Sequence, residues 1–366
     1  MTEQEHRFPC HSCGADMRFA PTEHALICDH CGAKEPFSET SPWENPSREM
    51  DYQAALEKSL PEDAFEETRT VTCSNCAAEI EFDANTHAKE CPFCATPVVT
   101  DTGINRHIKP RGLLSFALEE QDARKEMGNW LGKLWFAPNG LQDFARKGRP
   151  MQGVYVPYWT FDAQTASRYT GKRGDDYYVS RTVIRDGKPT QVRERRTRWR
   201  NVAGRVSRFF DDILISASRS IPKNDAENLG PWALSDLIPY RPEYLAGFRA
   251  EAYSVNLDDG FSDARDHMDR VIRRDIRFDI GGDHQRIETV NTKVSDVTFK
   301  HILLPVWLAA YNFRGETYRV LVNGHTGKVS GQRPWSVWKI TIAVILSLLV
   351  AGAIGYGISI SESGTV

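Results

Sequence analysis

The chain has 366 residues and a formal net charge of −3, and its length corresponds to two or three folded units. Its composition is that of an ordinary soluble protein except near the C-terminus. Residues 1–5 are acidic and contain no apolar run, so we expect no secretory signal there. Residues 1–333 should therefore begin in the cytosol, where thiols stay reduced and available to metal.

All eight cysteines fall in four Cys-x-x-Cys pairs, and the pairs form a motif that occurs twice. The spacing between the two pairs is the same in both copies, and one constant offset relates each cysteine of the second copy to its counterpart in the first. The same offset relates Phe19 to Phe82 and His24 to His87, so the whole module looks duplicated. The first copy contains Cys10, Cys13, Cys28 and Cys31, and the second contains Cys73, Cys76, Cys91 and Cys94.

This spacing is typical of a structural zinc site. Zn²⁺ in such sites takes four ligands in a tetrahedron, and two Cys-x-x-Cys turns joined by a hairpin supply four thiolates. A module of about 30 residues buries too little apolar surface to fold alone, so the metal must stabilise it. We predict two structural Zn²⁺ ions, in ribbons at residues 1–34 and 71–100. His24 and His87 are expected to be hydrogen-bond donors near the thiolates or strand residues rather than ligands.

Two other interpretations of the cysteines are less favoured. A disulfide framework requires an oxidising compartment, and a redox Cys-x-x-Cys normally occurs once, beside a βαβ pattern. A site closed by four thiolates has no open position for water, so the motif indicates structure rather than catalysis.

The connector at residues 35–70 is acidic, since residues 32–70 contain ten Asp/Glu and four Lys/Arg. After turns at Pro42 and Pro46, we expect a short helix from Ser47 to about Leu60, ended by Pro61. The segment could dock a partner, but a solvated linker is favoured because charged connectors are common.

Residues 104–333 are predicted to form a β-rich α+β domain with two main helices. Apolar side chains recur at three- and four-residue steps over Glu119–Leu134 and again over Asp258–Ile276. Strand-like segments precede these helices at 113–118 and 253–257. The predicted fold class is therefore α+β, flanked by the two ribbons and followed by one C-terminal transmembrane helix.

A second repeat is visible within this domain. Val156-Pro157-Tyr158-Trp159 resembles Leu304-Pro305-Val306-Trp307, and each segment follows one of the two helices. Each Pro-x-Trp strand is expected to enter a hairpin, at Tyr169–Gly171 and at Tyr311–Gly315. We interpret the pattern as a strand–helix–strand duplication, with chance similarity as the alternative. The tryptophans are assigned to the core.

The most basic stretch lies at residues 168–208, where thirteen Lys/Arg and four Asp/Glu give a net charge of +9. Five arginines between Arg193 and Arg200 alternate around Val192, Thr197 and Trp199, which suits a strand with a charged face. Such a strand could bind anionic lipid headgroups or nucleic-acid phosphates. A solvated hairpin face paired with acidic neighbours is the third interpretation.

Residues 340–360 form an apolar segment that includes no charged side chain. At about 1.5 Å per residue they reach about 31 Å, enough to cross the hydrocarbon core of a bilayer. Trp335 and Trp338 precede the segment, and Lys328, Arg333 and Lys339 flank it on the same side. We predict a single-pass span at 339–360 with the N-terminal part cytoplasmic, in preference to a buried core helix. Small residues at four-residue spacing permit helix association, so a homo-oligomer is compatible with the sequence.

No catalytic motif was found. Gly324–Ser330 is too short between its glycines for a phosphate loop and is expected to be a hairpin turn. The carboxylate pairs Asp211-Asp212 and Asp258-Asp259 are assigned to turns and helix caps, and His284 to an exposed loop. We therefore predict a protein that is not an enzyme.

The cysteine ribbons, the strings GVYVPYWTFDA (153–163) and LPVWLAAYNFRGETYRVLVNGHTGKVSGQRPWS (304–336), and the C-terminal span resemble a bacterial family of tail-anchored TFIIB-type zinc-ribbon proteins. Members are often labelled as primosomal protein N′ (replication factor Y)-like superfamily II helicases, but this chain lacks the phosphate loop of a helicase motor. Some relatives are linked to phage-shock-type envelope-stress systems. The resemblance implies a membrane-anchored adaptor or scaffold for protein partners at the cytoplasmic face of the inner membrane. The alternative is a membrane-tethered nucleic-acid-binding protein without helicase activity.

Overall fold

The computed structural model describes residues 8–36, 48–73, 75, 78–81, 88–91, 93, 96–99, 104–138, 151–185, 188–313 and 316–363. It has mixed α+β architecture around one β-rich sheet, which confirms the predicted fold class at that level. Three long strands dominate the sheet: β11 (Gln152–Arg185), β12 (Lys188–Ser216) and β15 (His284–Phe313). β11 lies between the other two and is antiparallel to both.

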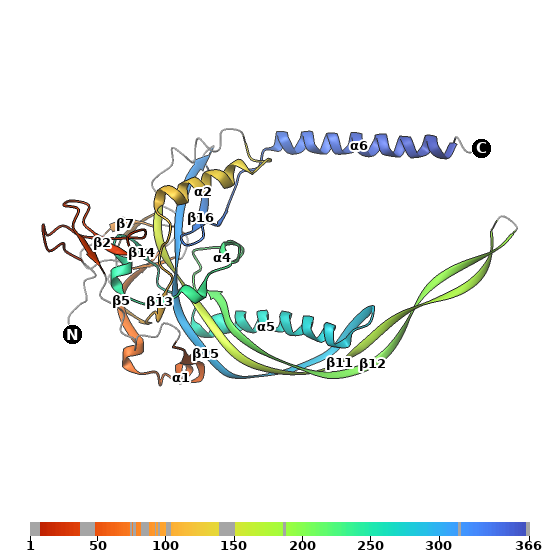
Figure 1. The fold of residues 1–366 in the computed structure, drawn as a ribbon, viewed down its shortest axis with the longest axis horizontal. Helices are drawn as coiled ribbons and strands as arrows, with labels where there is room; N and C mark the ends of the chain where they lie inside the picture. The colour runs from red at the N-terminus through yellow and green to blue at the C-terminus, as the bar shows by residue number, and fades with distance from the viewer. Residues whose placement is uncertain are drawn as a thin grey trace.

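Shorter strands complete this nine-stranded sheet: β4 (Met50–Asp51), β10 (Gly112–Leu113), β13 (Ile238–Pro239), β14 (Arg249–Ala250), β16 (Glu316–Asn323) and β17 (Val329–Gly331). The N-terminal modules carry β1 (Arg18–Ala20), β2 (Ala25–Ile27), β3 (Lys34–Pro36), β5 (Phe65–Thr72), β6 (Glu79–Glu81), β7 (Ala88–Glu90), β8 (Pro97–Val99) and β9 (Ile104–Ile108). Figure 1 shows them at the end of the body opposite the free tips of β11 and β12.

Two helices cover parts of the sheet. α2 (Glu120–Gly132) confirms the first predicted helix, and α5 (Leu257–Ile280) confirms the second and continues four residues beyond it. α5 lies along the long strands (Figure 1) and buries one row of side chains against them: Ala264, Met268, Ile272, Ile276 and Ile280. Gly281, with φ +64°, ends the helix because that backbone conformation suits glycine. The other α-helices in the described part of the chain are α1 (Tyr52–Leu56), α4 (Lys223–Leu229) and α6 (Val337–Ser363).

The segments that resemble each other in sequence are direct partners in the sheet. Val156 lies opposite Leu304, and the pairing is antiparallel. β10 runs parallel to β15, with Gly112 opposite Ile302, and β14 runs parallel to β11, with Arg249 opposite Val154. The short strand of each half therefore pairs with the long strand of the other half.

The same relation extends to side-chain contacts. Trp159 Nε1 donates to the carbonyl oxygen of Val255 at 2.9 Å, and Trp307 Nε1 donates to that of Leu118 at 3.0 Å. The two tryptophans occupy matching positions of the two long strands, and each bonds the segment that precedes the helix of the other half. Thus β10–α2–β11–β12 and β14–α5–β15–β16 have a pseudo-twofold arrangement.

Several local expectations were wrong. The connector helix α1 covers only Tyr52–Leu56, and the expected strand at 253–257 is irregular, while that at 113–118 is reduced to β10. The hairpin expected at Tyr169–Gly171 does not exist, because β11 continues to Arg185. Gly171 instead marks a shift in register, where a Cβ atom would lie 2.4 Å from the carbonyl oxygen of Arg286. The second hairpin is present between β15 and β16, with its turn outside the described residues.

Candidate metal centre

Cys10, Cys13, Cys28 and Cys31 converge at one end of the three-stranded sheet β1–β2–β3. All four Sγ atoms lie within 4.8 Å of one another. The Sγ atoms of Cys10 and Cys31 are 3.5 Å apart, as are those of Cys13 and Cys28. These separations exclude disulfides, which need about 2.05 Å, and all four thiols are free.

The backbone holds each Cys-x-x-Cys pair in the same turn. The amide of Cys10 donates to the carbonyl of Ala15 at 2.8 Å, and the amide of Cys28 donates to that of Ala33 at 2.9 Å. Gly14 and Gly32, the residues that follow each pair, have φ of +75° and +74°, which favours glycine. Two matching turns therefore present their thiols to each other across the hairpin.

The donor set fits Zn²⁺. A tetrahedral site with Zn–S bonds of about 2.3 Å places its sulfurs roughly 3.8 Å apart, close to the separations found here. The backbone amide of Ser12 is the main group that lowers the pKa of Cys10, to about 7, whereas the neighbouring thiols of Cys13 and Cys10 raise the pKa of Cys31 to about 12, so a bound cation is needed to hold all four as thiolates. Four thiolates would hold the ion and complete its coordination, so the ion would supply folding energy to this module.

His24 does not lie in a strand, contrary to one of the two roles expected for it. It lies exposed in the turn between β1 and β2, with φ +48°. Among the described residues, the four thiols have hydrogen bonds to one another and to backbone amides of their own turns, but not to His24. Its counterpart His87 lies outside the described residues.

The second cysteine motif is described only in part, because Cys76 and Cys94 lie outside the described residues. Cys73 and Cys91 are buried, each with 1% of its surface exposed. The amide of Cys73 donates to the carbonyl of Ala78 at 2.8 Å, and the amide of Cys91 donates to that of Thr96 at 2.8 Å. Each bond joins residues five positions apart, as in both turns of the first motif.

The first module packs against the body through Phe19. Its amide donates to the carbonyl of Ala246 at 2.9 Å, and its ring contacts those of Tyr244 and Phe248. Gly247, with φ +81°, lets the chain pass close to Arg18, since a Cβ atom there would lie 2.7 Å from the Cβ of Arg18. The metal centre is thereby fixed to the body.

α6 is the one helix among the described residues that is long and apolar enough to cross a membrane, with a candidate span at Val337–Gly355. None of that span is buried against the rest of the chain. The contacts to the body lie at its start, where the amide of Ser336 donates to the carbonyl of Phe136 at 2.7 Å and Lys339 Nζ donates to that of Ala137 at 2.8 Å. The prediction of one C-terminal helix long and apolar enough to cross a membrane is confirmed.

A second cluster, which no sequence motif indicated, lies at a bulge in the long strands. Glu49, Asp162 and Asp212 place carboxylate oxygens within 4.8 Å of one another. Lys300, only 4% exposed, lies among them, with Nζ 3.1 Å from Glu49 and 2.7 Å from Asp212. Burial, followed by the adjacent Glu49, raises the pKa of Asp162 to about 7. Asp212 is therefore an ion-pair partner, not merely a turn residue, and the ammonium group occupies the position that a cation would take.

Replacing Lys300 with methionine is expected to lower the free energy of unfolding by about 3 kcal/mol or more, because it leaves the carboxylates without their buried counter-ion. Lys172→Met is the matched control, since Lys172 pairs with Glu288 at 3.2 Å in an exposed position. That control should change stability by less than about 1 kcal/mol. Chemical unfolding of the full-length protein in detergent measures both; equal effects would contradict the assigned role of Lys300.

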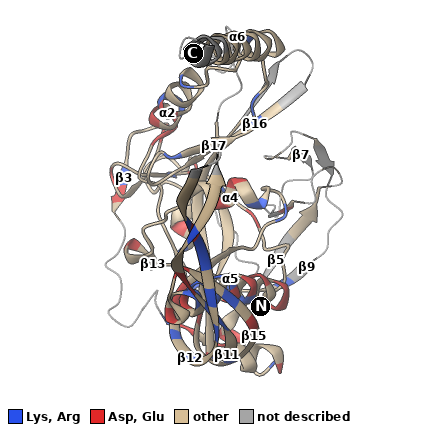
Figure 2. Ribbon diagram, turned by 90° about the vertical axis from the view of Figure 1, so that its right-hand side faces the viewer, with Lys and Arg blue, Asp and Glu red and all other residues tan. Residues whose placement is uncertain are grey.

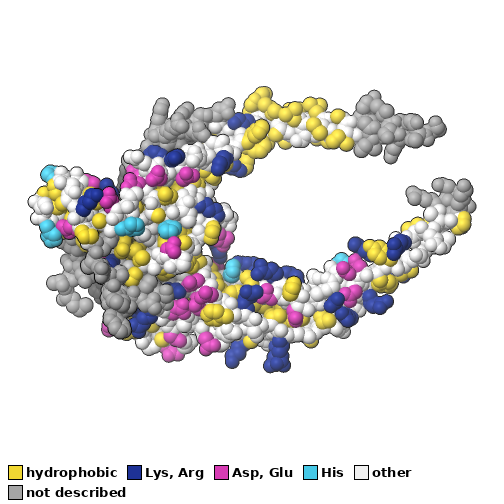
Figure 3. All heavy atoms as spheres, viewed as in Figure 1, with side chains coloured by type: hydrophobic (Ala, Val, Ile, Leu, Met, Phe, Trp, Pro, Cys, Tyr) yellow, Lys and Arg dark blue, Asp and Glu magenta, His cyan; other side chains and the backbone are white. Residues whose placement is uncertain are grey.

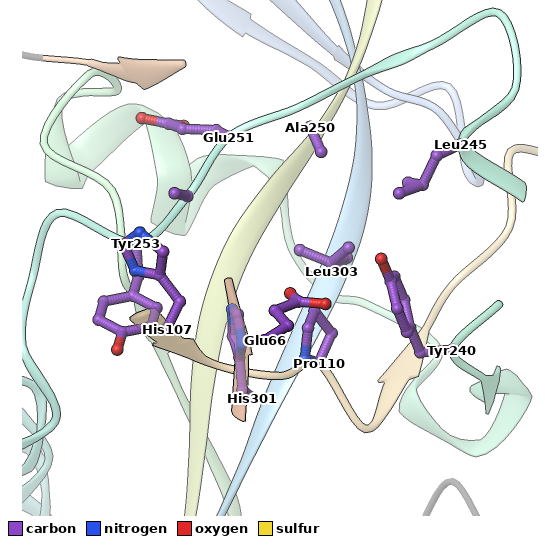
Figure 4. Close-up of a pocket in the computed structure, with 11 residues that line it drawn as sticks. Glu66, His107, Pro110, Tyr240, Leu245, Ala250, Glu251, Tyr253, His301 and Leu303 are labelled. Atoms are coloured by element: carbon purple, nitrogen blue, oxygen red, sulfur yellow. The ribbon is translucent and has the colours of Figure 1, made fainter. Parts of the chain in front are cut away.

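A small pocket of about 10 Å³ lies between β9, β15 and the segment 250–253, with room for a single water. Figure 4 shows His301 and Glu66 near its centre, and His107 and Tyr253 to one side. His301 Nδ1 donates to the carbonyl of Ile108 at 2.7 Å, and its Nε2 has no hydrogen-bond partner among the described residues. Burial raises the pKa of Glu66 to about 7 and lowers that of His301 to about 4.

Glu251, at the edge of this pocket, is 1% exposed and accepts a hydrogen bond from Ser218 Oγ at 2.8 Å. Burial raises its pKa from the ordinary 4.5 to about 8, because the protonated carboxyl is the form that the folded protein favours. The full stabilisation is therefore present below pH 4.5 and is lost as the pH rises through 8. Glu251→Gln is expected to remove that loss, up to about 4 kcal/mol. Thermal unfolding at pH 5 and pH 8, with exposed Glu227→Gln as control, tests this; an unchanged pH dependence in Glu251→Gln contradicts it.

His284, assigned from the sequence to an exposed loop, contacts two groups instead. Its Nε2 is 3.1 Å from Asp176 Oδ1, and its ring lies 6.2 Å from that of Trp199. Asp258 does lie in the first turn of α5, as the cap assignment expects, and also accepts a hydrogen bond from Tyr52 at 2.8 Å.

The chain is similar to YdjG. Over 242 residues it is 25% identical to this uncharacterized protein of Bacillus subtilis (strain 168), and the match covers 65% of this chain and 67% of YdjG. No family model matches the chain, and no solved structure matches it.

Proposed function

We propose that this protein is a non-enzymatic adaptor, anchored in the inner membrane by α6, that presents two zinc ribbons to protein partners on the cytoplasmic side. The observation that carries the proposal is that one chain contains both a cluster of four thiols and an apolar helix that is not buried. Four thiolates leave no coordination position for a substrate, so the ion would act as a structural element.

A second zinc ion belongs to the proposal. Cys73 and Cys91 repeat the burial and the amide hydrogen bonds of Cys10 and Cys28. Because those bonds shape each turn of the first motif, the same bonds in the second support the same role. Cys76 and Cys94 would supply the other two ligands.

The proposed orientation rests on the charges beside α6. Lys328 and Arg333 precede the candidate span and Lys339 lies in its first turn, and positive charges are retained on the cytoplasmic side. Arg333 also lies over the ring of Trp335 at 4.2 Å, a pairing suited to the interface between water and lipid. The body would then face the cytoplasm. The resemblance to tail-anchored zinc-ribbon proteins supports this arrangement and suggests a role in an envelope-stress complex.

Affinity purification of the full-length protein from detergent-solubilised membranes, with and without nuclease, tests the adaptor role. The expected result is one set of proteins, identified by mass spectrometry, that is unchanged by nuclease. Loss of the whole set after nuclease would contradict the proposal and favour a membrane-tethered nucleic-acid-binding protein.

A further inference from the structure

The hairpin of β11 and β12 extends far beyond the rest of the sheet. β15 pairs with β11 only as far as His284, which lies opposite Gly174. Beyond that point, residues 175–185 pair only with residues 188–198, and we call these two segments the arm. At about 3.3 Å per residue the arm is roughly 36 Å long. Figure 1 shows it projecting away from the body without a covering helix.

The arm has no core of its own. Its larger apolar side chains lie open to solvent: Ile184 is 81% exposed, Tyr178 60% and Val192 44%. An isolated two-stranded hairpin is only marginally stable in water, and a third strand or a packing surface normally stabilises it. The described residues supply neither, so a surface outside this chain is the natural support for the arm.

The charges of the arm are distributed unevenly along its length. Both aspartates at its base are paired: Asp175 with Arg173 at 2.8 Å, and Asp176 with His284 at 3.1 Å. Three exposed arginines form no ion pair with any described residue: Arg198 at the base, opposite Asp175, and Arg181 and Arg193 further along. These guanidinium groups are available to an anionic partner.

Arginine and tyrosine pair on both faces of the arm. Arg193 lies over the ring of Tyr178 at 5.1 Å, and Arg198 lies over that of Tyr177, also at 5.1 Å. Neighbouring residues of a strand point to opposite faces, so Tyr177 and Tyr178 carry the same chemistry to the two sides. Each pair combines a cation with an amphipathic ring, and tyrosine is enriched where membrane meets water.

The arm and α6 leave the body on the same side, as Figures 1 and 3 show. Figure 2 views both from their free ends, with the ribbon of the hairpin blue at its arginine and lysine positions. We propose that the arm binds the headgroup layer of an anionic lipid membrane, the same membrane that α6 crosses. This inference rests on the proposed membrane anchoring. The charged side chains keep the arm out of the hydrocarbon, whereas each arginine at an anionic surface is attracted to it.

This placement requires α6 to tilt relative to the arm. The contacts between α6 and the described body are confined to its start, at Ser336 and Lys339. The helix beyond Lys339 can therefore change its direction relative to the body without breaking the fold. The protein would then contact the membrane at two places, the span and the arm. A body held at two points presents its ribbons in a defined direction.

Hydrogen–deuterium exchange of the full-length protein in nanodiscs tests the proposal. One set of nanodiscs contains phosphatidylcholine alone, and the other includes phosphatidylglycerol as the anionic lipid. Amides of residues 175–198 are expected to exchange on the order of 100-fold more slowly in the anionic discs, from about 1 kcal/mol for each of three arginines. Arg181→Gln, Arg193→Gln and Arg198→Gln together should abolish this difference. The control replaces three exposed arginines of α5, Arg270, Arg274 and Arg277, and should retain it.

Each outcome has one meaning. Equal exchange of the arm in both discs, or loss of the difference in the α5 control, overturns the proposal. A third outcome is that amide exchange of the arm slows only when a single-stranded oligonucleotide is added to the neutral discs. That outcome would also overturn the proposal and assign the surface to nucleic acid. Failure of the chain to remain in either disc would instead contradict the membrane span of α6, so the two hypotheses are tested separately.

Discussion

Replacing Cys10 and Cys13 with serine is expected to remove one zinc ion per chain and to unfold residues 8–36. The core of this module is small, consisting mainly of Met17, Phe19 and Leu26 with the buried cysteines. Zinc binding in modules of this size contributes about 10–16 kcal/mol, far more than such a core provides. Without it, Phe19 should leave its contacts with Tyr244 and Phe248.

Zinc analysis by mass spectrometry and limited proteolysis measure the two effects of that change. The full-length wild-type chain should contain two zinc ions and the double variant one, with new cleavage confined to the first module. His30→Ser is the matched control, because His30 lies exposed between Cys28 and Cys31. Unchanged zinc content in the cysteine variant would refute the assignment, and loss of zinc in His30→Ser would make histidine a ligand.

Deleting residues 335–366 is expected to move the protein from the membrane fraction to the soluble fraction. The apolar side chains of α6 are exposed from Val337 to Ile354, so we expect the helix to contribute membrane affinity but little packing to the body. The thermal midpoint of the truncated protein should therefore remain close to that of the full chain in detergent. The deletion removes few hydrogen bonds to the body, chiefly those of Ser336 and Lys339.

Fractionation in high salt separates this effect from binding by the arm, because salt screens surface electrostatics. Deletion of residues 361–366 alone is the control and should leave the protein in membranes. A chain without residues 335–366 that stays in the membrane fraction at high salt would show that another element anchors it.

The sequence was most informative where structure depends on local spacing. Four cysteines in two Cys-x-x-Cys pairs, separated by enough chain for one short hairpin, predict a convergent set of thiols without knowledge of the rest of the fold. The apolar rows of α2 and α5 are equally local. α5 exceeds its predicted end because Ile280 continues the buried row and Gly281 follows it.

The long strands could not be predicted in the same way. Tyr169-Thr170-Gly171 has the composition of a turn, yet Gly171 serves a bulge within one continuous strand. A glycine in a bulge and a glycine in a turn are distinguished by the residues on the neighbouring strand, and the local sequence does not identify those residues. The pseudo-twofold pairing of β10 and β14 is likewise a property of the whole sheet.

The cluster around Lys300 depends on segments far apart in the chain. Glu49 belongs to the connector, Asp162 and Asp212 to two strands beside a bulge, and Lys300 to a third. The one local signal was Lys300 beside His301 in the otherwise apolar segment 299–309, since a buried ammonium group requires a counter-ion. The identity of that counter-ion was accessible only from the register.

The central claim is that this chain holds other proteins at the membrane. The most direct measurement is the distribution of the co-purified partners between membrane and soluble fractions, compared in cells with the full chain and cells with the chain lacking residues 335–366. We expect the partners to follow the truncated protein into the soluble fraction and to remain bound to it there. Partners that stay at the membrane in the same amount, whichever form of the chain is present, would contradict the adaptor account.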